Sequence, residues 1–184
     1  METRKQIRER LKQKRDSLSQ AQVQQWSAEI CKNIEAHPWF VQAETVCFYY
    51  PLGKEADLRP LAETAWSMGK KTAFPRVAGR EMQFYQADSF TEFAEGSFHV
   101  MEPVGTTVIY QEDALVLTPG LGFDWQGARI GYGGGYYDRY FAGRPHKYKL
   151  GVAYAMQLVE RLHPKEHDVR MDGVAAETGI MIVR

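Results

Sequence analysis

The first part of the chain carries apolar residues at the spacing of an amphipathic helix. In residues 2–17 the apolar positions return at helical intervals, and basic residues fill the other faces. A second helix is expected after Ser19, because Ser19 followed by Gln22 three residues later is typical of a capping box. Its apolar positions keep the same spacing and are Val23, Trp26, Ile30 and Ile34. This helix should end near His37 and Pro38, since a proline disfavours helical conformation in the residue before it.

Short apolar runs rich in β-branched and aromatic residues follow, and they alternate with helical segments. The run from Thr45 to Tyr50 predicts a buried strand, after which Asp57 is expected to cap a helix that continues to Met68 and ends at Gly69. Further strands are expected at 71–75, 82–85, 113–119, 150–154 and 179–183. Parallel strands need crossover connections, so this alternation predicts an α/β fold with helices on both faces of one sheet.

Length, composition and charge narrow the classes of protein that the chain can form. Its 184 residues fit a single domain, 1–184, and 44% hydrophobic with 25% charged residues is ordinary globular usage. Basic and acidic residues number 23 each, and this net charge of zero argues against a dedicated nucleic-acid binder. Cys31 and Cys47 form neither a CxxC pair nor a disulfide framework, and no run approaches the ~20 apolar residues of a membrane span. We therefore expect a cytoplasmic protein without a membrane or nucleic-acid partner.

A glycine-rich segment after the 113–119 strand is the most informative part of the sequence. Four glycines stand within five positions, Gly131, Gly133, Gly134 and Gly135, where backbone N–H groups can converge on phosphate oxygens. The segment does not fit the dinucleotide pattern, which needs glycine where Tyr136 stands, and it does not fit the Walker pattern. It is therefore either an unclassified phosphate-binding loop or a flexible turn between a strand and a helix.

Charged residues beside this segment favour the phosphate interpretation. Arg129 can offer a forked cation to a phosphate, and Asp138 is placed to hold Mg²⁺ beside it. Either Asp168 or Asp172 could complete such a metal site, although both are also ordinary turn residues. The basic N-terminal helix is open to two interpretations, a solvated face or a polyphosphate contact.

Two other kinds of catalytic site are not indicated by the sequence. The five histidines show no HExxH spacing, so a catalytic zinc site is not expected. No GxSxG sequence occurs, and nothing local supports a serine or cysteine nucleophile.

The glycine-rich segment and its flanks resemble the signature of a known enzyme family. Pro-Gly-Leu-Gly-Phe-Asp at 119–124, followed by Gly-Ala-Arg-Ile-Gly-Tyr-Gly-Gly-Gly-Tyr-Tyr-Asp-Arg at 127–139, is similar almost residue for residue to the signature of the 5-formyltetrahydrofolate cyclo-ligases, also called methenyltetrahydrofolate synthetases. The resemblance extends over nearly the whole chain. It implies a three-layer α/β/α sandwich, Rossmann-like, with a mostly parallel central sheet.

The resemblance also implies which residues form the site. The implied ATP contacts are Arg4, Lys5, Gln6, Ile7, Arg8, Arg129, Ile130, Gly131, Tyr132, Gly133, Gly134, Gly135, Tyr136 and Tyr137. The implied folate contacts are Tyr50, Glu55, Tyr132, Gly133, Gly134, Gly135 and Tyr136. The implied Mg²⁺ ligands are Asp138 and Asp168, and the implied catalytic residues are Arg129 and Tyr136.

One position departs from the pattern of some relatives, which carry a lysine within the loop where this chain has Gly134. Positive charge would then come from Arg129 and Arg8, whose guanidinium groups match phosphate in a fork. The implied reaction converts 5-formyltetrahydrofolate and ATP into 5,10-methenyltetrahydrofolate, ADP and phosphate with Mg²⁺, in a monomeric enzyme. Two alternatives remain: an ATP-dependent small-molecule kinase with the same loop, and an RNA-binding module that uses the basic N-terminus and aromatic residues.

Overall fold

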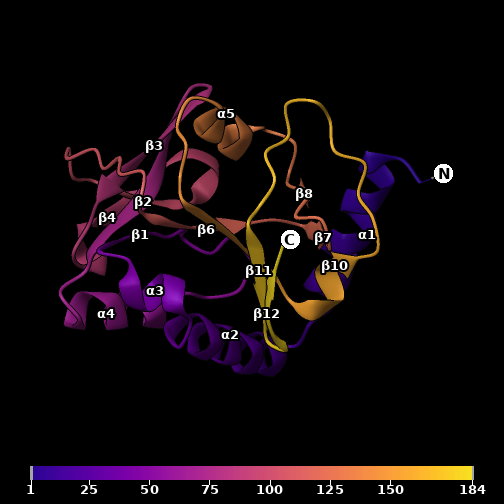
Figure 1. Cartoon of the computed structure of the whole chain (residues 1–184), viewed down its shortest axis with the longest axis horizontal. Coiled ribbons are helices and arrows are strands. Elements are labelled where there is room, and N and C mark those ends of the chain that lie inside the picture. The colour runs from indigo at the N-terminus through magenta and orange to yellow at the C-terminus, as the bar shows by residue number, and fades with distance from the viewer. Residues whose placement is uncertain (1, 184) are drawn as a thin grey trace.

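The fold is built around a seven-stranded sheet in a computed structural model that describes residues 2–183 (Figure 1). Its strand order is β12-β11-β9-β6-β1-β2-β3. Neighbouring strands are parallel, except that the edge strands β3 and β12 pair antiparallel with β2 and β11. The strand bounds are β1 Thr45–Cys47, β2 Lys71–Ala78, β3 Glu81–Gln86, β6 Leu115–Pro119, β9 Tyr148–Val152, β11 Gly173–Ala176 and β12 Gly179–Ile182. The expected mostly parallel sheet is confirmed.

Helices cover both faces of this sheet, but unevenly. The helix bounds are α1 Arg4–Asp16, α2 Gln20–Glu35, α3 Pro38–Gln42, α4 Arg59–Ser67 and α5 Tyr136–Ala142. Figure 1 shows α2, α3 and α4 together on one side of the sheet and α5 on the other. The chain therefore forms the expected α/β/α sandwich with one thick and one thin helical layer.

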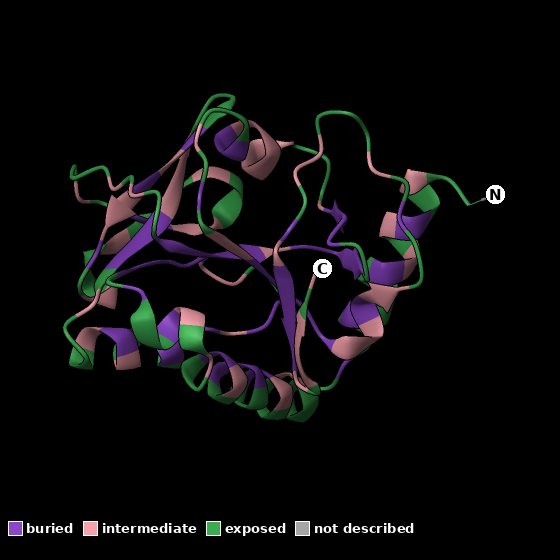
Figure 2. Ribbon diagram, viewed as in Figure 1, coloured by how far each residue is buried: buried purple, intermediate pink, exposed green. Residues whose placement is uncertain are grey.

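Residues in the central strands alternate between two cores. In β6, Leu115 and Leu117 pack with α2, α3 and α4, whereas Val116 packs on the opposite face with Tyr140 and Phe141 of α5. Successive side chains of a strand point to opposite faces, so a strand with helices on both sides must be apolar throughout. Figure 2 shows this pattern as a buried sheet between helices whose outer surfaces are exposed.

The strand order fixes where a ligand can bind. The connection β1–α4–β2 runs toward one edge of the sheet, while β6–α5–β9 runs toward the other. Right-handed crossovers that run in opposite directions place their helices on opposite faces, which leaves a crevice beyond the carboxyl ends of β1 and β6. Sheets of this kind bind their ligands at such a point.

The sequence analysis did not predict β11 of the main sheet. It also missed two smaller sheets and three 3₁₀ turns. Their strands are β4 Phe93–Glu95, β5 Met101–Pro103, β7 Gly122–Asp124, β8 Arg129–Ile130 and β10 Leu158–Val159, and the turns are η1 Phe90–Glu92, η2 Ser97–His99 and η3 Ala155–Gln157. Strands of two or three residues are too short to show an alternating pattern. The sheet of β10, β7 and β8 carries the apolar surface on which α1 docks through Ile7 and Leu11.

The helix-end predictions are borne out in part. Ser19 forms the expected capping box with Gln22. Gly69 follows α4 with a φ of +72°, as its role in ending the helix requires. The prediction for Asp57 is wrong by one residue, because Leu58 occupies the N-cap position while the Asp57 carboxylate accepts from the Arg59 N–H at 3.0 Å.

The predicted limits of other elements need similar corrections. The helix expected to end near Pro38 ends at Glu35, and Pro38 instead begins the short helix α3. Proline is well suited to a first helical turn, where its missing N–H would have had no partner. The strand expected at Thr45–Tyr50 ends at Cys47, after which the chain turns into the crevice.

Replacing Ser19 by alanine should lower the stability of the fold. The Oγ atom accepts the Gln22 N–H at 3.1 Å, and loss of such a cap costs about 1 kcal/mol. Urea unfolding should therefore show a reduced free energy of unfolding with an unchanged denaturant slope. Gln20→Ala, at an exposed neighbouring position, should change stability by less than about 0.5 kcal/mol. Equal effects of the two substitutions would contradict a capping role.

Candidate functional site

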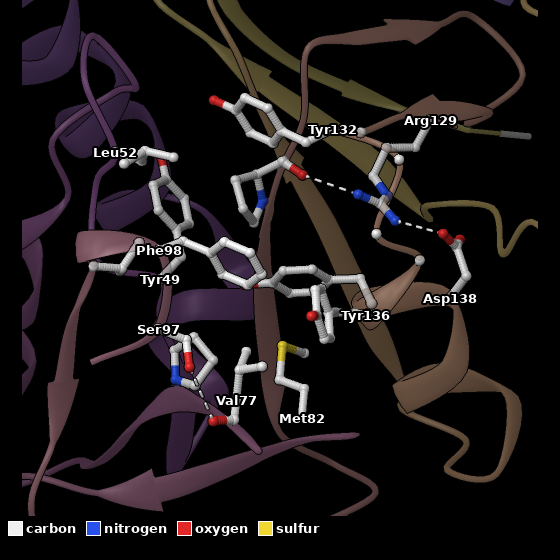
Figure 3. Close-up of a pocket in the computed structure, with 18 of the residues that line it drawn as sticks. Tyr49, Leu52, Val77, Met82, Ser97, Phe98, Arg129, Tyr132, Tyr136 and Asp138 are labelled. Carbon is white, nitrogen blue, oxygen red and sulfur yellow. Dashed lines mark hydrogen bonds and ion pairs between the residues drawn. The ribbon is translucent and has the colours of Figure 1, made fainter. Parts of the chain in front are cut away.

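A cavity of about 510 Å³ occupies the crevice at the carboxyl ends of β1, β2 and β6 (Figure 3). Its walls come from α1, the loop after β1, the β4–β5 turn, the glycine-rich loop with the start of α5, and the loop that contains Lys165 and Asp168. These segments are far apart in the sequence. The fold therefore brings the N-terminal, central and C-terminal thirds of the chain to one site.

The glycine-rich loop forms one wall of the cavity in backbone conformations that side chains disfavour. Gly133 has a φ of +107°, and Gly135 has a φ of +68° at the N-cap of α5. A Cβ atom on Gly131 would lie 2.9 Å from a guanidinium nitrogen of Arg129. The loop thus needs glycine both for its own turn and for the close approach of the neighbouring arginine.

Arg129 lies below this loop and is almost fully buried. Its two terminal nitrogens donate to the carbonyl oxygen of Pro119 at 3.3 Å and to the carboxylate of Asp138 at 2.9 Å (Figure 3). The guanidinium carbon also lies 5.4 Å from the centre of the Tyr137 ring. The second carboxylate oxygen of Asp138 accepts the backbone N–H of Val169 at 3.1 Å. These contacts tie β8, α5 and the C-terminal loop together around one cation.

Two arginines of α1 face the same part of the cavity. Arg4 forms an ion pair of 2.7 Å with Asp168 and donates to the carbonyl oxygen of His163 at 2.9 Å. Arg8 donates through Nε to the carbonyl oxygen of Gly131 at 2.8 Å. The basic N-terminal helix is thus not merely a solvated face.

Other residues of the implied ATP set do not reach the cavity wall. Gln6 closes a capping box with Thr3 at the start of α1. Ile7 and Ile130 are buried together in the small core between α1 and the β10-β7-β8 sheet, and Lys5 is exposed. None of these four residues lines the cavity.

A buried carboxylate marks the opposite part of the cavity. Glu55, 6% exposed, accepts the backbone N–H of Leu52 at 2.9 Å and the hydroxyl of Tyr132 at 3.0 Å. The pKa of Glu55 is raised, because burial outweighs the nearby charge of Arg15 and these two hydrogen bonds, which lower it. The resemblance placed Glu55 in the folate site, and it lines the cavity beside Tyr50.

The structure adds an apolar surface that the sequence analysis missed. Val77, Met82 and Phe98 line the cavity, and Phe98 stands edge-on to Tyr136 with ring centres 6.0 Å apart (Figure 3). Phe98 is 66% exposed and adopts a φ of +58°, which is unusual for an aromatic residue. Glu102 accepts the backbone N–H of Val77 at 3.1 Å and so fixes the β4–β5 turn to β2. No local motif distinguishes Phe98 from a surface residue in the sequence.

The two tyrosines that open α5 differ in their surroundings. The hydroxyl of Tyr136 donates to the carbonyl oxygen of Gly79 at 3.2 Å, so its ring rather than its hydroxyl faces the cavity. The hydroxyl of Tyr137 is buried and has no hydrogen-bond partner among residues 2–183. Burial raises the pKa of Tyr137, which keeps this hydroxyl protonated and able to donate.

The two aspartates that the resemblance marks as metal ligands, Asp138 and Asp168, both line the cavity. Asp172, the other candidate, lies elsewhere and accepts the backbone N–H of Lys149 at 2.7 Å. Among residues 2–183 no group of three or more acidic, histidine or cysteine side chains is placed to hold a metal ion. Two carboxylates beside a phosphate-type loop fit Mg²⁺, because Mg²⁺ is usually bound through one or two carboxylates together with substrate phosphates.

The fold and the cavity together define an α/β protein with a phosphate-type loop beside an apolar pocket that holds a carboxylate. Residues 1–177 match the 5-formyltetrahydrofolate cyclo-ligase family, and the chain belongs to that family. A relative from Escherichia coli K12, 5-formyltetrahydrofolate cyclo-ligase, is 28% identical over 179 residues, which cover 92% of this chain and 98% of that protein. The mouse 5-formyltetrahydrofolate cyclo-ligase is 26% identical over 188 residues, which cover 93% of this chain and 92% of the mouse protein. The resemblance noted from the glycine-rich segment is confirmed.

Solved structures show the same architecture. The 5,10-methenyltetrahydrofolate synthetase of Aquifex aeolicus superposes with a TM-score of 0.88 at 32% identity, over 98% of this chain and 93% of that one. The synthetase of Mycoplasma pneumoniae, at 22% identity, shares the fold with a TM-score of 0.76 over 95% of this chain and 98% of that one. The three-layer sandwich predicted from the sequence is therefore the fold of the family.

Proposed function

We propose that this protein cyclises 5-formyltetrahydrofolate to 5,10-methenyltetrahydrofolate, with ATP as co-substrate and Mg²⁺ as cofactor. One observation carries the proposal: a single cavity joins a phosphate-type loop flanked by arginines to an apolar pocket with a buried carboxylate. The first half suits a triphosphate and the second suits a pteridine ring. A reaction between the two substrates needs both halves in contact.

The phosphate half consists of Arg8, Arg129 and the glycine-rich loop. Both guanidinium groups touch the loop or lie directly below it, where they can neutralise phosphate oxygens. The N–H groups of the loop add donors that no side chain blocks. Asp138 and Asp168 would hold Mg²⁺ against the phosphates, and Mg²⁺ when bound would offset charge on them.

The folate half consists of Glu55 and the aromatic surface. A carboxylate can accept hydrogen bonds from the amino and ring N–H groups of a pteridine, and Glu55 lines the cavity with both oxygens fixed by donors. The rings of Phe98 and Tyr136 stand at the mouth of this pocket and suit a flat ring system. We assign Tyr136 to the formyl end, since it lies next to the glycine-rich loop.

The reaction itself needs no nucleophile from the protein. The formyl oxygen attacks the γ-phosphorus of ATP and the bond to ADP breaks, which leaves the phosphoryl group on the formyl oxygen and an imidate-like C=N bond to N5. N10 then attacks the former formyl carbon, loses its proton, and the C–O bond breaks to release phosphate. The protein contributes alignment and charge neutralisation, which dominate phosphoryl transfer. Arg129 serves this role because Asp138 and Pro119 hold it in one orientation.

A small-molecule kinase is the alternative with the same loop. The two activities differ in their products, since the cyclo-ligase releases free phosphate and forms the methenyl chromophore, whereas a kinase leaves phosphate on its product. Purified protein with 5-formyltetrahydrofolate, ATP and Mg²⁺ should develop methenyl absorbance, and omission of any one component should abolish it. A phosphorylated metabolite without methenyl absorbance would overturn the proposal.

We further propose a monomer in the cytoplasm with no nucleic-acid partner. Cys31 and Cys47 are free and buried, as in proteins of a reducing compartment. No helix formed by residues 2–183 combines the length and apolar character of a membrane span. Sedimentation of the purified protein tests whether it is a monomer. RNA binding that weakens with salt would contradict the absence of a nucleic-acid partner.

Asp138→Asn should lower turnover at least tenfold and raise the Mg²⁺ concentration needed for half activity. The substitution removes one carboxylate charge, and each ~1.4 kcal/mol of lost transition-state stabilisation is a factor of ten in rate. The measurement is the methenyl assay across a Mg²⁺ titration. Asp113→Asn, at an exposed position, is the matched control and should behave as wild type. Lower turnover with an unchanged Mg²⁺ response would mean that Asp138 only positions Arg129.

Gly133→Val should abolish cyclisation without unfolding the protein. At a φ of +107° a β-branched residue is strained, and its side chain would occupy space beside the Arg8 guanidinium, which lies 3.8 Å from the Cβ position. Circular dichroism with thermal melting, alongside the methenyl assay, separates the two effects. Gly143→Val, where φ is −105° and no atom lies within 4 Å, should keep activity. A folded Gly133→Val protein with more than about half of wild-type turnover, a loss of less than ~0.5 kcal/mol, would refute the phosphate-cradle interpretation.

A further inference from the structure

Three arginines of α1 lie in one stripe along the helix. Arg4, Arg8 and Arg15 are separated by four and seven residues, which places them within about 40° of each other around the axis. Arg4 and Arg8 reach the phosphate half of the cavity. Arg15 comes from the last turn of the helix and reaches the folate half instead. The function proposed above gives Arg15 no role.

Arg15 is unusually buried for an arginine. Its side chain is 3% exposed, one terminal nitrogen donates to the hydroxyl of Tyr132, and the other lies 3.6 Å from a carboxylate oxygen of Glu55. That second nitrogen and Nε have no hydrogen-bond partner among residues 2–183. Removing an arginine from water without full pairing is costly, so such a residue is not explained by helix docking alone.

The charge of Arg15 stabilises the carboxylate of Glu55. The groups that face Glu55 are Arg15 from α1, Tyr132 from the glycine-rich loop, Tyr49 from the loop after β1 and Tyr137 from α5. Burial raises the pKa of all three tyrosines, so they stay neutral at physiological pH. Arg15 is therefore the cation that offsets the burial of this carboxylate. A protonated Glu55 would lose acceptor capacity toward substrate N–H groups.

We propose that Arg15 is a positioning residue for the folate substrate, whose charge stabilises the Glu55 carboxylate and which, through the Tyr132 hydroxyl, holds that carboxylate turned into the cavity. The inference rests on the proposed function, in which Glu55 accepts hydrogen bonds from the folate. Tyr132 accepts from Arg15 and donates to Glu55, so the three groups form one chain of hydrogen bonds. Arg15 itself does not line the cavity.

The first test follows the ionisation of Glu55 directly and needs no catalytic activity. Protein labelled with ¹³C in the glutamate carboxyl groups is titrated by NMR, and Glu55→Gln assigns the Glu55 signal. Arg15→Met keeps a long side chain and removes the charge, and Arg15→Lys keeps the charge without the fork. Arg10→Met is the matched control, because Arg10 is on the same helix and pairs with Glu2 near the surface. Arg15→Met should raise the pKa of Glu55 by about one unit or more, and Arg15→Lys and Arg10→Met should leave it near the wild-type value.

The second test separates the two substrates kinetically. Arg15→Met should raise the KM for 5-formyltetrahydrofolate at least tenfold and change the KM for ATP less than twofold. The acid limb of kcat/KM for the folate should move to higher pH, because Glu55 then needs a higher pH to ionise. Part of the lost kcat/KM should return above the raised pKa of Glu55. Arg15→Lys should show a smaller rise in the folate KM, and Arg10→Met should match wild type.

Each outcome decides a distinct point. An unshifted Glu55 titration in folded Arg15→Met, or equal rises in the KM of both substrates with an unmoved pH profile, would overturn the proposal and leave Arg15 as an anchor of α1. If Arg15→Met does not fold, Arg15→Lys decides, since a rise in the folate KM alone supports the proposal and equal rises overturn it. If the wild-type protein forms no methenyl product, the proposed function fails. The NMR titration then still decides whether Arg15 controls the ionisation of Glu55.

Discussion

The site depends on the pairing of arginines with carboxylates that the fold places beside them. Arg129 pairs with Asp138 within the glycine-rich segment, whereas Arg4 with Asp168 and Arg15 with Glu55 join segments that are far apart in the sequence. A buried charge without its partner costs several kcal/mol, so the pairs fix where α1, the glycine-rich loop and the C-terminal loop lie relative to one another. Arg4 and Arg129 also line the cavity, so their ion pairs belong to both the fold and the candidate site.

This arrangement explains how a protein with no net charge can have a cavity that is locally basic at one end. The net charge of the chain is zero, yet Arg4, Arg8 and Arg129 all lie at one end of the cavity. The carboxylates that balance them are held by backbone N–H groups, as Val169 holds Asp138 and Lys165 holds Asp168. Local charge of this kind attracts phosphate without creating the extended basic surface that would also attract nucleic acid.

The sequence alone was sufficient for the part of the site that is contiguous. Residues 119–139 contain the strand end, the cation, the glycines and Asp138 in order, so local patterns and a family resemblance identified them together. Phe98 and Arg15 could not be found in this way, because their roles arise from contacts with Tyr136 and Glu55 that are distant in the sequence. Strands were likewise predictable only where a local pattern exists. The long apolar run of β6 was recognisable in the sequence, whereas β8 has two residues and shows no pattern of its own.

The docking of α1 also affects the order in which parts of the protein fold during synthesis. The helix is made before the segments on which it packs, because its apolar face contacts Leu121, Ile130 and Leu162, and Arg4 pairs with Asp168. At ordinary rates of synthesis the interval is on the order of ten seconds. During that time a basic amphipathic helix has no native partner. Chaperones that hold nascent chains would therefore meet this helix while it is undocked, and its docking would be among the last steps of folding.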